Sequence, residues 1–298
     1  MLSEMRAFVA FTDAGTVQAT AARLNLTQSA VTRQLQRLEQ QLGTALLDRR
    51  TKPPAITPAG RALLQRCRAI LRDVADLKAG LAPDHPPSGN FRIGVGYVLA
   101  DDEIAACVHG IGQDFPNVSI SLRTDWHPAL IEMVRQGGLD IAVIPTRPDL
   151  PLPVEVRGAI VGREPLVFVA AKGSAIGGRP TLAALARLPW IVKPKGTGTR
   201  EVLDAALQRE SLALGEHSEV RDENLQLSLV ARGLGLALAT RRSVARHPRN
   251  KALRSLSLRG HQMHLDVVMI RSHPLGRLEP VADAFASALR ARFAARRR

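Results

Sequence analysis

The sequence has little of what catalysis or metal binding would need. It contains only two cysteines, its eight histidines are dispersed, and it has no HExxH, GxSxG or P-loop motif. Cys67 and Cys107 lie in apolar stretches of helical pattern, which predicts two buried thiols in a reducing compartment. We therefore expect no enzymatic activity, no metal and no cofactor.

Long apolar runs and an export signal are also absent. No stretch of about eighteen apolar residues occurs, so no membrane-spanning helix is predicted. The N-terminal sequence MLSEMRAFVAF contains Glu4 and is soon followed by Asp13, and it lacks the basic start and clean apolar stretch of a secretory signal. The chain is therefore predicted to be cytoplasmic, with no membrane partner.

Negative charge is scarce as well. The chain has 41 lysines and arginines against 27 aspartates and glutamates, which gives a formal charge of +14. Such a surface attracts nucleic acid, because each neutralised phosphate releases condensed counterions. The sequence is rich in alanine, arginine, glycine and leucine, so part of this charge reflects composition, and the charge alone does not define the function.

Three segments of the chain differ in character. Residues 1–81 are helical in pattern, apart from the basic break RRTKPPAI, and APDHPPSGN at 82–90 reads as a linker. From residue 91 onward short apolar strands alternate with helices, and a final helix is expected at 278–297. This rhythm predicts open, mostly parallel sheets in two α/β subdomains. The predicted strands are FRIGVGY, VSISLRT, LDIAVI, PLVFVAA, PWIVK, LGLALAT and LDVVMI.

The most informative segment is TVQATAARLNLTQSAVTRQLQRLEQQLG at 16–43. A first helix, built around Ala21, Ala22 and Leu24, is followed by a short turn. Thr27 can cap a second helix by accepting a hydrogen bond from a free backbone N–H. In that helix one apolar stripe is expected to face the core, formed by Val31, Leu35, Leu38 and Leu42. The pattern indicates a helix-turn-helix.

The polar face of the second helix has the side chains that DNA reading requires. They can hydrogen bond to base edges and phosphates in a major groove, and they are Gln28, Ser29, Thr32, Arg33 and Gln36. Any amphipathic helix has a polar face, but here no acidic residue occurs between Asp13 and Glu39. A surface that lies against phosphates needs such an acid-free stretch, so the segment is predicted to bind DNA.

The segment FVAFTDAGTVQATAARLNLTQSAVTRQLQRLEQQLGTALLDR, followed by ITPAG, resembles the N-terminal signature of LysR-type transcriptional regulators. The resemblance implies a sequence-specific DNA-binding regulator controlled by a small-molecule effector, with contact to RNA polymerase. It implies DNA reading by Gln28, Ser29, Thr32 and Arg33, and a wing at 49–54 whose phosphate-binding residues are Arg49, Arg50 and Lys52. Leu47 departs from the family, which usually has an aromatic residue there.

The resemblance also implies the architecture. The expected fold is α/β, with an almost all-α winged helix-turn-helix domain at 1–56 and a periplasmic-binding-protein-like pair of α/β subdomains at 91–298. Subdomain I is expected at about 91–161 plus 266–298, and subdomain II at about 162–265. Segment 57–90 is the expected linker helix and hinge.

The linker helix is predicted to dimerise. Thr57 and Pro58 form a helix start, and apolar residues then recur in steps of four and three at Leu63, Cys67, Ile70, Val74, Leu77 and Leu81. The alternative is one helix packed on its own domain. A dimer is favoured because so long a rod overruns a small winged domain. Two chains demand a near-palindromic DNA site, and the family commonly assembles further into tetramers.

The effector is expected beyond the carboxyl ends of the strands, as in other open α/β sheets. The predicted binding residues are Tyr97, Val98, Trp126, Thr146, Thr197, Gly198 and Thr199. KGTGTR at 195–200 carries most weight, because free N–H groups at a helix start suit a small anion, although a simple cap is the alternative.

Three residues argue against an acid-binding pocket. Tyr97 stands where the family often has a small hydroxyl residue, so its phenol is expected to fill part of the cleft. Asp101 and Asp102 would repel an anion unless they only cap the following helix. The sequence therefore leaves open an anionic, neutral, cationic or absent effector. The expected mechanism has two states, in which a ligand shifts subdomain closure and so moves the paired linker helices on DNA.

Two rival classes of protein explain less of the sequence. GVGYVL at 94–99 begins like a dinucleotide fingerprint, but it lacks the third glycine, and Ser121 and Arg123 replace the acid expected after the next strand. A sequence-indifferent architectural DNA-binding protein would suit the charge but would not need the large C-terminal half. His261 and His264 are expected at the surface, and the basic end RARFAARRR is expected to be a solvated helix terminus.

Overall fold

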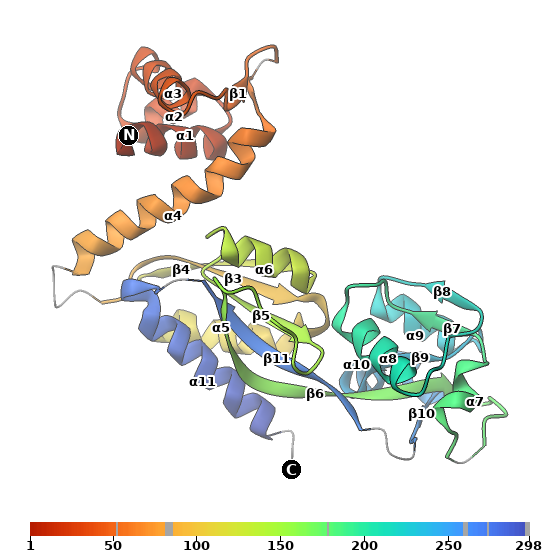
Figure 1. Cartoon of the computed structure of the whole chain (residues 1–298). Helices are drawn as coiled ribbons and strands as arrows, with labels where there is room; N and C mark the ends of the chain where they lie inside the picture. The colour runs from red at the N-terminus through yellow and green to blue at the C-terminus, as the bar shows by residue number, and fades with distance from the viewer. Residues whose placement is uncertain (52, 81–85, 178, 259–261, 273, 296–298) are drawn as a thin grey trace.

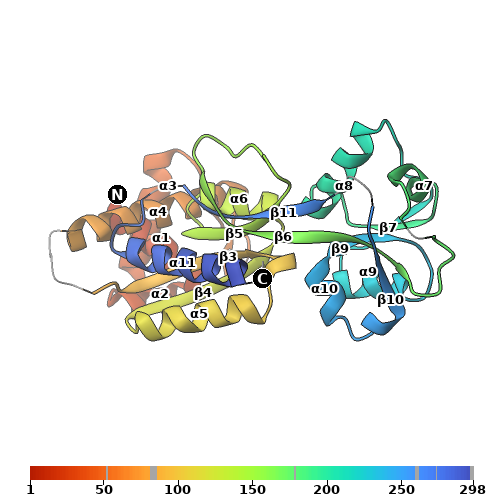
Figure 2. The same ribbon diagram turned by 90° about the horizontal axis from the view of Figure 1, so that it is seen from below.

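The computed structural model describes residues 1–51, 53–80, 86–177, 179–258, 262–272 and 274–295 (Figure 1). The predictions made for Lys52, Leu81, His261 and the last three arginines lie outside these residues. A small helical domain is followed by one long helix and then by an elongated α/β part with two lobes (Figures 1 and 2). No helix in the described part of the chain is both long and apolar enough to cross a membrane.

The N-terminal domain is a winged helix-turn-helix. Its elements are α1 (Leu2–Ala14), α2 (Val17–Leu24), α3 (Gln28–Leu42) and the two wing strands β1 (Leu47–Asp48) and β2 (Ala55–Ile56). Asn25 ends α2 at a φ of 53°, a left-handed conformation that its short polar side chain tolerates. Thr27 Oγ1 accepts the N–H of Ala30 at 3.2 Å, which confirms the predicted cap of α3.

Three members of the predicted apolar stripe of α3 form the core of this domain. Val31, Leu35 and Leu38 are buried against Phe8 of α1. Leu42 was predicted to join them but is 38% exposed, because it is the last residue of α3 and lies beyond the core. The recognition helix is thus held by its middle, and its N-terminal turn is left at the surface.

The long helix α4 (Pro58–Gly80) starts as predicted, with Thr57 Oγ1 accepting the N–H of Gly60 at 3.0 Å. Its first turns pack on the winged domain: Cys67 is fully buried in that core and Leu63 packs against it. The prediction of an open seam from Leu63 onward is therefore corrected. Exposed apolar side chains begin at Ile70 (41%) and continue with Leu77 (69%).

In the described part of the C-terminal half, seven strands form one mixed sheet and two form a separate parallel pair. The large sheet has the order β10-β6-β11-β5-β3-β4, with β9 also paired to β6. Its strands are β3 (Gly89–Gly96), β4 (Val118–Asp125), β5 (Ile141–Thr146), β6 (Arg157–Ala171), β9 (Ala237–Thr240), β10 (Leu253–Leu256) and β11 (Met263–Arg271). The small pair is β7 (Trp190–Val192) and β8 (His217–Glu219).

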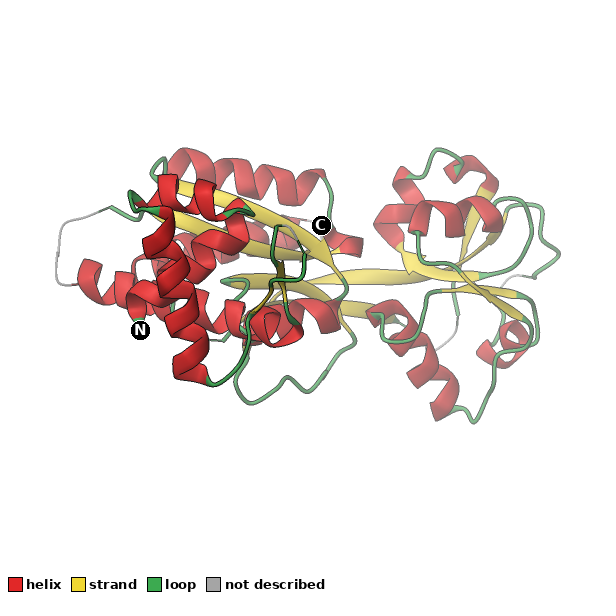
Figure 3. Cartoon of the chain, turned by 90° about the horizontal axis from the view of Figure 1, so that it is seen from above, coloured by secondary structure: helices red, strands yellow, loops and turns green. Residues whose placement is uncertain are grey.

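The prediction of mostly parallel sheets is wrong. β3 is parallel to β4 and β5, but β11 is antiparallel to β5 and β6, and β6 is antiparallel to β9 and β10. The reason is the connection between the lobes. β6 carries the chain into the second lobe and β11 brings it back, so these neighbouring strands run in opposite directions (labelled in Figure 2; Figure 3 shows strands crossing between the lobes from the other side).

Helices cover the strands of both lobes. Subdomain I contains β3, β4 and β5 with α5 (Asp102–Asp114), α6 (His127–Arg135) and α11 (Glu279–Ala295). Subdomain II contains β7 to β10 with α7 (Leu182–Ala186), α8 (Gly198–Arg209), α9 (Glu223–Val230) and α10 (Arg241–Arg246). Short 3₁₀ turns are η1 (Tyr97–Leu99), η2 (Asn250–Ala252) and η3 (Gly276–Leu278).

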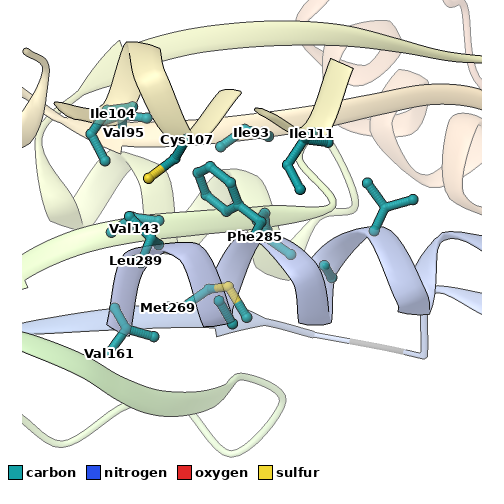
Figure 4. Packing of buried hydrophobic residues seen from close by; sticks show 14 of the residues in the cluster. Ile93, Val95, Ile104, Cys107, Ile111, Val143, Val161, Met269, Phe285 and Leu289 are labelled. Atoms are coloured by element: carbon teal, nitrogen blue, oxygen red, sulfur yellow. The ribbon is translucent and has the colours of Figure 1, made fainter. Parts of the chain in front are cut away.

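Subdomain I has a continuous apolar core between α5, α11 and the sheet. Phe285 of α11 lies beside Cys107 and Ile111 of α5 (Figure 4). Both cysteines are buried and free, as predicted, and burial raises the pKa of the Cys67 and Cys107 thiols. The core gives the cleft residues at the strand ends a rigid support.

Candidate nucleic-acid interface and ligand cleft

The polar residues predicted to read DNA lie on the exposed side of α3. Gln28, Ser29, Arg33 and Gln36 are exposed, and Thr32 is half-buried. The Thr32 hydroxyl donates to the Gln28 carbonyl at 2.9 Å, and Ser29 Oγ lies 3.0 Å from Thr27 Oγ1. Among the described residues, none accepts from or donates to the side chains of Gln28, Arg33 or Gln36. These side chains therefore keep their hydrogen-bonding capacity for another molecule.

The wing arginines are ion-paired in the free chain. Arg49 Nη2 lies 2.6 Å from Glu39 Oε2, and Arg50 Nη2 lies 2.6 Å from Asp48 Oδ2. The hydrogen bonds from Arg50 lower the pKa of the Asp48 carboxyl to about 2. The Arg50 side chain is 90% exposed, so this pair is weak and leaves the guanidinium accessible to a phosphate.

Glu39 connects the recognition helix to the wing. Its Oε1 accepts the backbone N–H groups of Leu46 and Leu47 at 2.9 and 3.1 Å, while Oε2 binds Arg49. In the sequence, Glu39 marks only the end of an acid-free stretch. Its role could have been inferred from its position: an acidic residue next to a DNA-binding surface would repel phosphates unless hydrogen bonds or a cation of the same chain occupy its carboxylate.

Six of the seven predicted effector residues line one narrow cleft where the subdomains meet. They are Tyr97, Val98, Trp126, Thr197, Gly198 and Thr199, around a space of about 20 Å³. Thr146 does not line it; this residue is buried within β5, paired in register with Asp266 of β11. A Cβ on Gly198 would stand 2.7 Å from the Pro145 carbonyl oxygen, so the first turn of α8 lies directly against the end of β5.

A larger cavity of about 510 Å³ shares the wall made by Tyr97, Val98 and Trp126. The Tyr97 and Trp126 rings meet edge to face with centroids 4.9 Å apart, and the Arg221 guanidinium lies 5.5 Å from the Trp126 ring. Tyr97 is 49% exposed. Its phenol therefore lies in the wall that the narrow cleft and this cavity share.

Asp101 joins the two subdomains beside this cavity. Its Oδ1 accepts the N–H groups of Glu103 and Ile104, so the capping alternative is confirmed for Asp101. Its Oδ2 accepts from Arg242 at 2.6 Å and from Arg246 at 2.7 Å, both on α10. The Asp101 charge is thus met by two guanidinium groups and does not by itself repel an anion.

Three charged groups of the cavity region were not found from the sequence. Glu164 is 2% exposed and lies 3.5 Å from Arg242, and its burial raises the pKa of its carboxyl. Lys193 is 4% exposed and Glu223 begins α9. Their positions in the chain give no local signal, because the strands and helices that bring them together are far apart in sequence.

A histidine and a glutamate face each other across the narrow cleft. His127 Nε2, at the start of α6, lies 3.6 Å from Glu201 Oε1 of α8. The neighbouring His127 imidazole holds the pKa of the Glu201 carboxyl below its ordinary value. The pair therefore ties subdomain I to subdomain II at the cleft. Within the described residues, no group of three or more His, Cys, Asp or Glu side chains could hold a metal ion.

The fold and the two sites define a class: a winged helix-turn-helix protein that carries a ligand-binding α/β domain. Residues 2–61 match the family model "Bacterial regulatory helix-turn-helix protein, lysR family", and residues 84–294 match "LysR substrate binding domain". The chain belongs to the LysR family. It is a DNA-binding transcriptional regulator with an effector-binding domain, and not an enzyme.

Relatives and solved structures agree with this membership. The chain is 31% identical to the transcriptional regulator CbbR of Sinorhizobium medicae, over 82% of this chain and 78% of the relative. It is 30% identical to a probable hydrogen peroxide-inducible genes activator of Mycobacterium leprae, over 80% of this chain and 76% of the relative.

The solved structures show the fold. A full-length OxyR from Pseudomonas aeruginosa matches with a TM-score of 0.76 and 17% identity, over 97% of this chain and 94% of that one. The full-length CbnR complexed with its target DNA matches with a TM-score of 0.62 and 19% identity, over 98% and 99% of the two chains.

Proposed function

We propose that this protein binds a near-palindromic promoter site as a dimer and changes its grip on DNA when a small molecule enters the cleft between its subdomains. The observation that carries the proposal is the exposed part of α3 before Glu39, which has no acidic residue and where Gln28, Arg33 and Gln36 have no intrachain partner among the described residues. Side chains of this kind read base edges in a major groove.

The wing supplies phosphate contacts that fix the register of α3. Arg49, Arg50 and Lys52 are the proposed contacts, of which Arg49 is positioned by Glu39. Thr32 and Ser29 complete the proposed DNA-reading set. In this arrangement the wing sets the position of the domain on the duplex, and α3 selects the sequence.

Dimerisation is assigned to the outer part of α4. A helix of 23 residues is about 35 Å long, more than the winged domain can cover. Ile70 and Leu77 are exposed on it and Val74 is half-buried between them, at the spacing of a helix seam. Two such dimers would form a tetramer, the larger assembly proposed for this chain.

Effector binding is assigned to the cleft residues Tyr97, Val98, Trp126, Thr197, Gly198 and Thr199. The proposed domains are 1–56 for DNA binding, 57–90 for dimerisation and 91–298 for effector binding.

A ligand that binds the closed arrangement of the subdomains better than the open one, or the reverse, shifts the population between these two states. The helix α4 passes that shift to the DNA-binding domains. The proposed place of action is the cytoplasm, in contact with RNA polymerase at the promoter.

DNase footprinting tests the DNA-binding part. The purified protein is incubated at physiological salt with DNA upstream of its own gene and competitor DNA. A bounded, near-palindromic protected site is expected, and Arg33→Ala and Gln28→Ala should each weaken it by about tenfold or more, since one base contact contributes about 1–3 kcal/mol. The matched control is Arg179→Ala, an exposed arginine in subdomain II. Uniform binding that ignores these substitutions would contradict sequence-specific reading.

A further inference from the structure

The 510 Å³ cavity contains a buried cation without a paired anion. Lys193 is 4% exposed, and its Nζ donates to the backbone carbonyl of Arg221 at 2.9 Å. Among the described residues, no carboxylate oxygen lies within ion-pair distance of this ammonium, which has three donors. A buried charge that is not fully hydrogen-bonded is costly, and burial here lowers the pKa of Lys193.

An unused acceptor is buried beside the same cavity. Glu223 Oε2 accepts from the Ser243 hydroxyl at 2.8 Å, but Glu223 Oε1 is buried and has no hydrogen-bond partner. Both Glu223 and Lys193 line the cavity. The subdomain II side of the cavity thus offers free donors on a cation and, once the Glu223 carboxylate turns toward the cavity, a free acceptor. A single small ligand can satisfy both kinds of group.

The remaining charges of the cavity favour an anion. Its lining carries the cations Lys193, Arg221, Arg242 and Arg246 against the anions Asp101, Asp222 and Glu223, which is four positive charges against three negative. Asp222 is already used as the cap of α9, where it accepts the N–H of Leu225 at 2.7 Å. Asp101 is held by Arg242 and Arg246. Arg221 is exposed and its guanidinium lies over the Trp126 ring, so Lys193 is the buried cation of the cavity with unused donors.

We propose that the effector is a small organic acid with a hydrogen-bond donor, an amino or hydroxy carboxylate, whose carboxylate binds Lys193 and whose donor binds Glu223 Oε1. The inference rests on the proposed effector function of this cleft and names its ligand class. The apolar part of the ligand lies against Trp126 and Tyr97, which form the opposite wall.

Tryptophan fluorescence and thermal melting of the full-length protein test this ligand class. Trp126 lines the cavity whereas Trp190 is buried, so a ligand in the cavity changes the Trp126 signal. Each set of probes shares one skeleton: phenylalanine, phenyllactate, hydrocinnamate and phenylalaninamide, and likewise alanine, lactate, propionate and alaninamide. In at least one set, the amino or hydroxy acid should bind about tenfold or more tightly than the plain acid and the amide.

Two variants assign the contacts. Lys193→Met should remove the preference for the acid over its amide, and the matched control Lys195→Met, an exposed lysine two residues away, should keep it. Glu223→Met should remove most of the preference for the amino acid over the plain acid, and exposed Glu216→Met should not. The comparison of acid with amide uses the unaltered protein, so it tests for a bound carboxylate even if Lys193→Met fails to fold.

The outcomes separate this inference from the proposed function. Equal binding of acids and amides, or no probe binding by a protein that still gives its footprint, would overturn the assignment of Lys193 while the DNA-binding function stands. Equal binding of plain and donor-bearing acids would overturn the assignment of Glu223. Loss of the footprint in the unaltered protein would overturn the proposed function instead.

Discussion

Replacing Glu39 with alanine should loosen the wing and weaken DNA binding. Glu39 is 11% exposed at its side chain, and one of its oxygens accepts two backbone N–H groups, those of Leu46 and Leu47, in the turn that leads into β1. Both leucines are buried, so these N–H groups have no ready access to water when the carboxylate is removed. The other oxygen holds Arg49 at 2.6 Å.

The size of the effect follows from these contacts. Each buried N–H left without a partner costs about 1–3 kcal/mol, so Glu39→Ala, which leaves two, should destabilise the wing by about 2–6 kcal/mol. The ion pair adds less than about 1 kcal/mol, because the Arg49 side chain is 48% exposed. The free energy of unfolding of a domain of this size is roughly 3–9 kcal/mol in all, so the wing should open while the helices stay folded.

Hydrogen exchange followed by mass spectrometry is the suitable measurement, since both tryptophans, Trp126 and Trp190, lie outside the winged domain. Peptides covering residues 44–57 should exchange faster in Glu39→Ala, and footprint affinity should fall by about tenfold or more. Glu39→Gln keeps one acceptor oxygen, so its exchange rate should lie between those of the unaltered protein and Glu39→Ala. Gln40→Ala, at an exposed position, serves as the control. Unchanged exchange in Glu39→Ala would refute the role given to these contacts.

Three further outcomes are expected. Leu77→Asp should shift the protein toward monomer in sedimentation velocity and leave its melting temperature unchanged, because Leu77 is 69% exposed on α4. Gly198→Ala should cost about 1–3 kcal/mol in urea unfolding, since its Cβ would stand 2.7 Å from the Pro145 carbonyl oxygen. Lowering the pH should lower the free energy of unfolding, because His127 lowers the pKa of the Glu201 carboxyl. The stability that this interaction contributes is fully present above the ordinary glutamate pKa and is lost as the pH falls through the lowered pKa of Glu201.

Each of these outcomes has a matched control. Ala75→Asp introduces the same charge at an exposed position of α4 outside the seam, and it should not alter sedimentation. Equal effects of Ala75→Asp and Leu77→Asp would contradict a seam at Leu77. Gly110→Ala adds a Cβ with nothing within 4 Å and should not destabilise the chain, so a cost as large as that of Gly198→Ala would contradict the clash. Melting between neutral and acid pH should vary less in Glu201→Gln, and identical profiles would rule out its contribution.

The sequence alone determined the winged helix-turn-helix and the character of the C-terminal half. The turn at Asn25, the Thr27 cap and the stripe of Val31, Leu35 and Leu38 depend on contacts within a few residues, which a local pattern records. The apolar runs predicted as strands became β3 to β7, β9 and β11 for the same reason. The polar face of α3 followed from its helical period.

Only the tertiary structure decided strand direction, the end of the apolar seam and which charged side chains line the cavity. The antiparallel course of β6 and β11 follows from the crossing between lobes, and Cys67 leaves the seam because the winged core covers it. Arg242 reaches Asp101 across 141 positions of sequence. Lys193, which follows β7, and Glu223 of α9 come together by packing within subdomain II. The burial of a charge is a property of the folded neighbourhood and not of the adjacent residues.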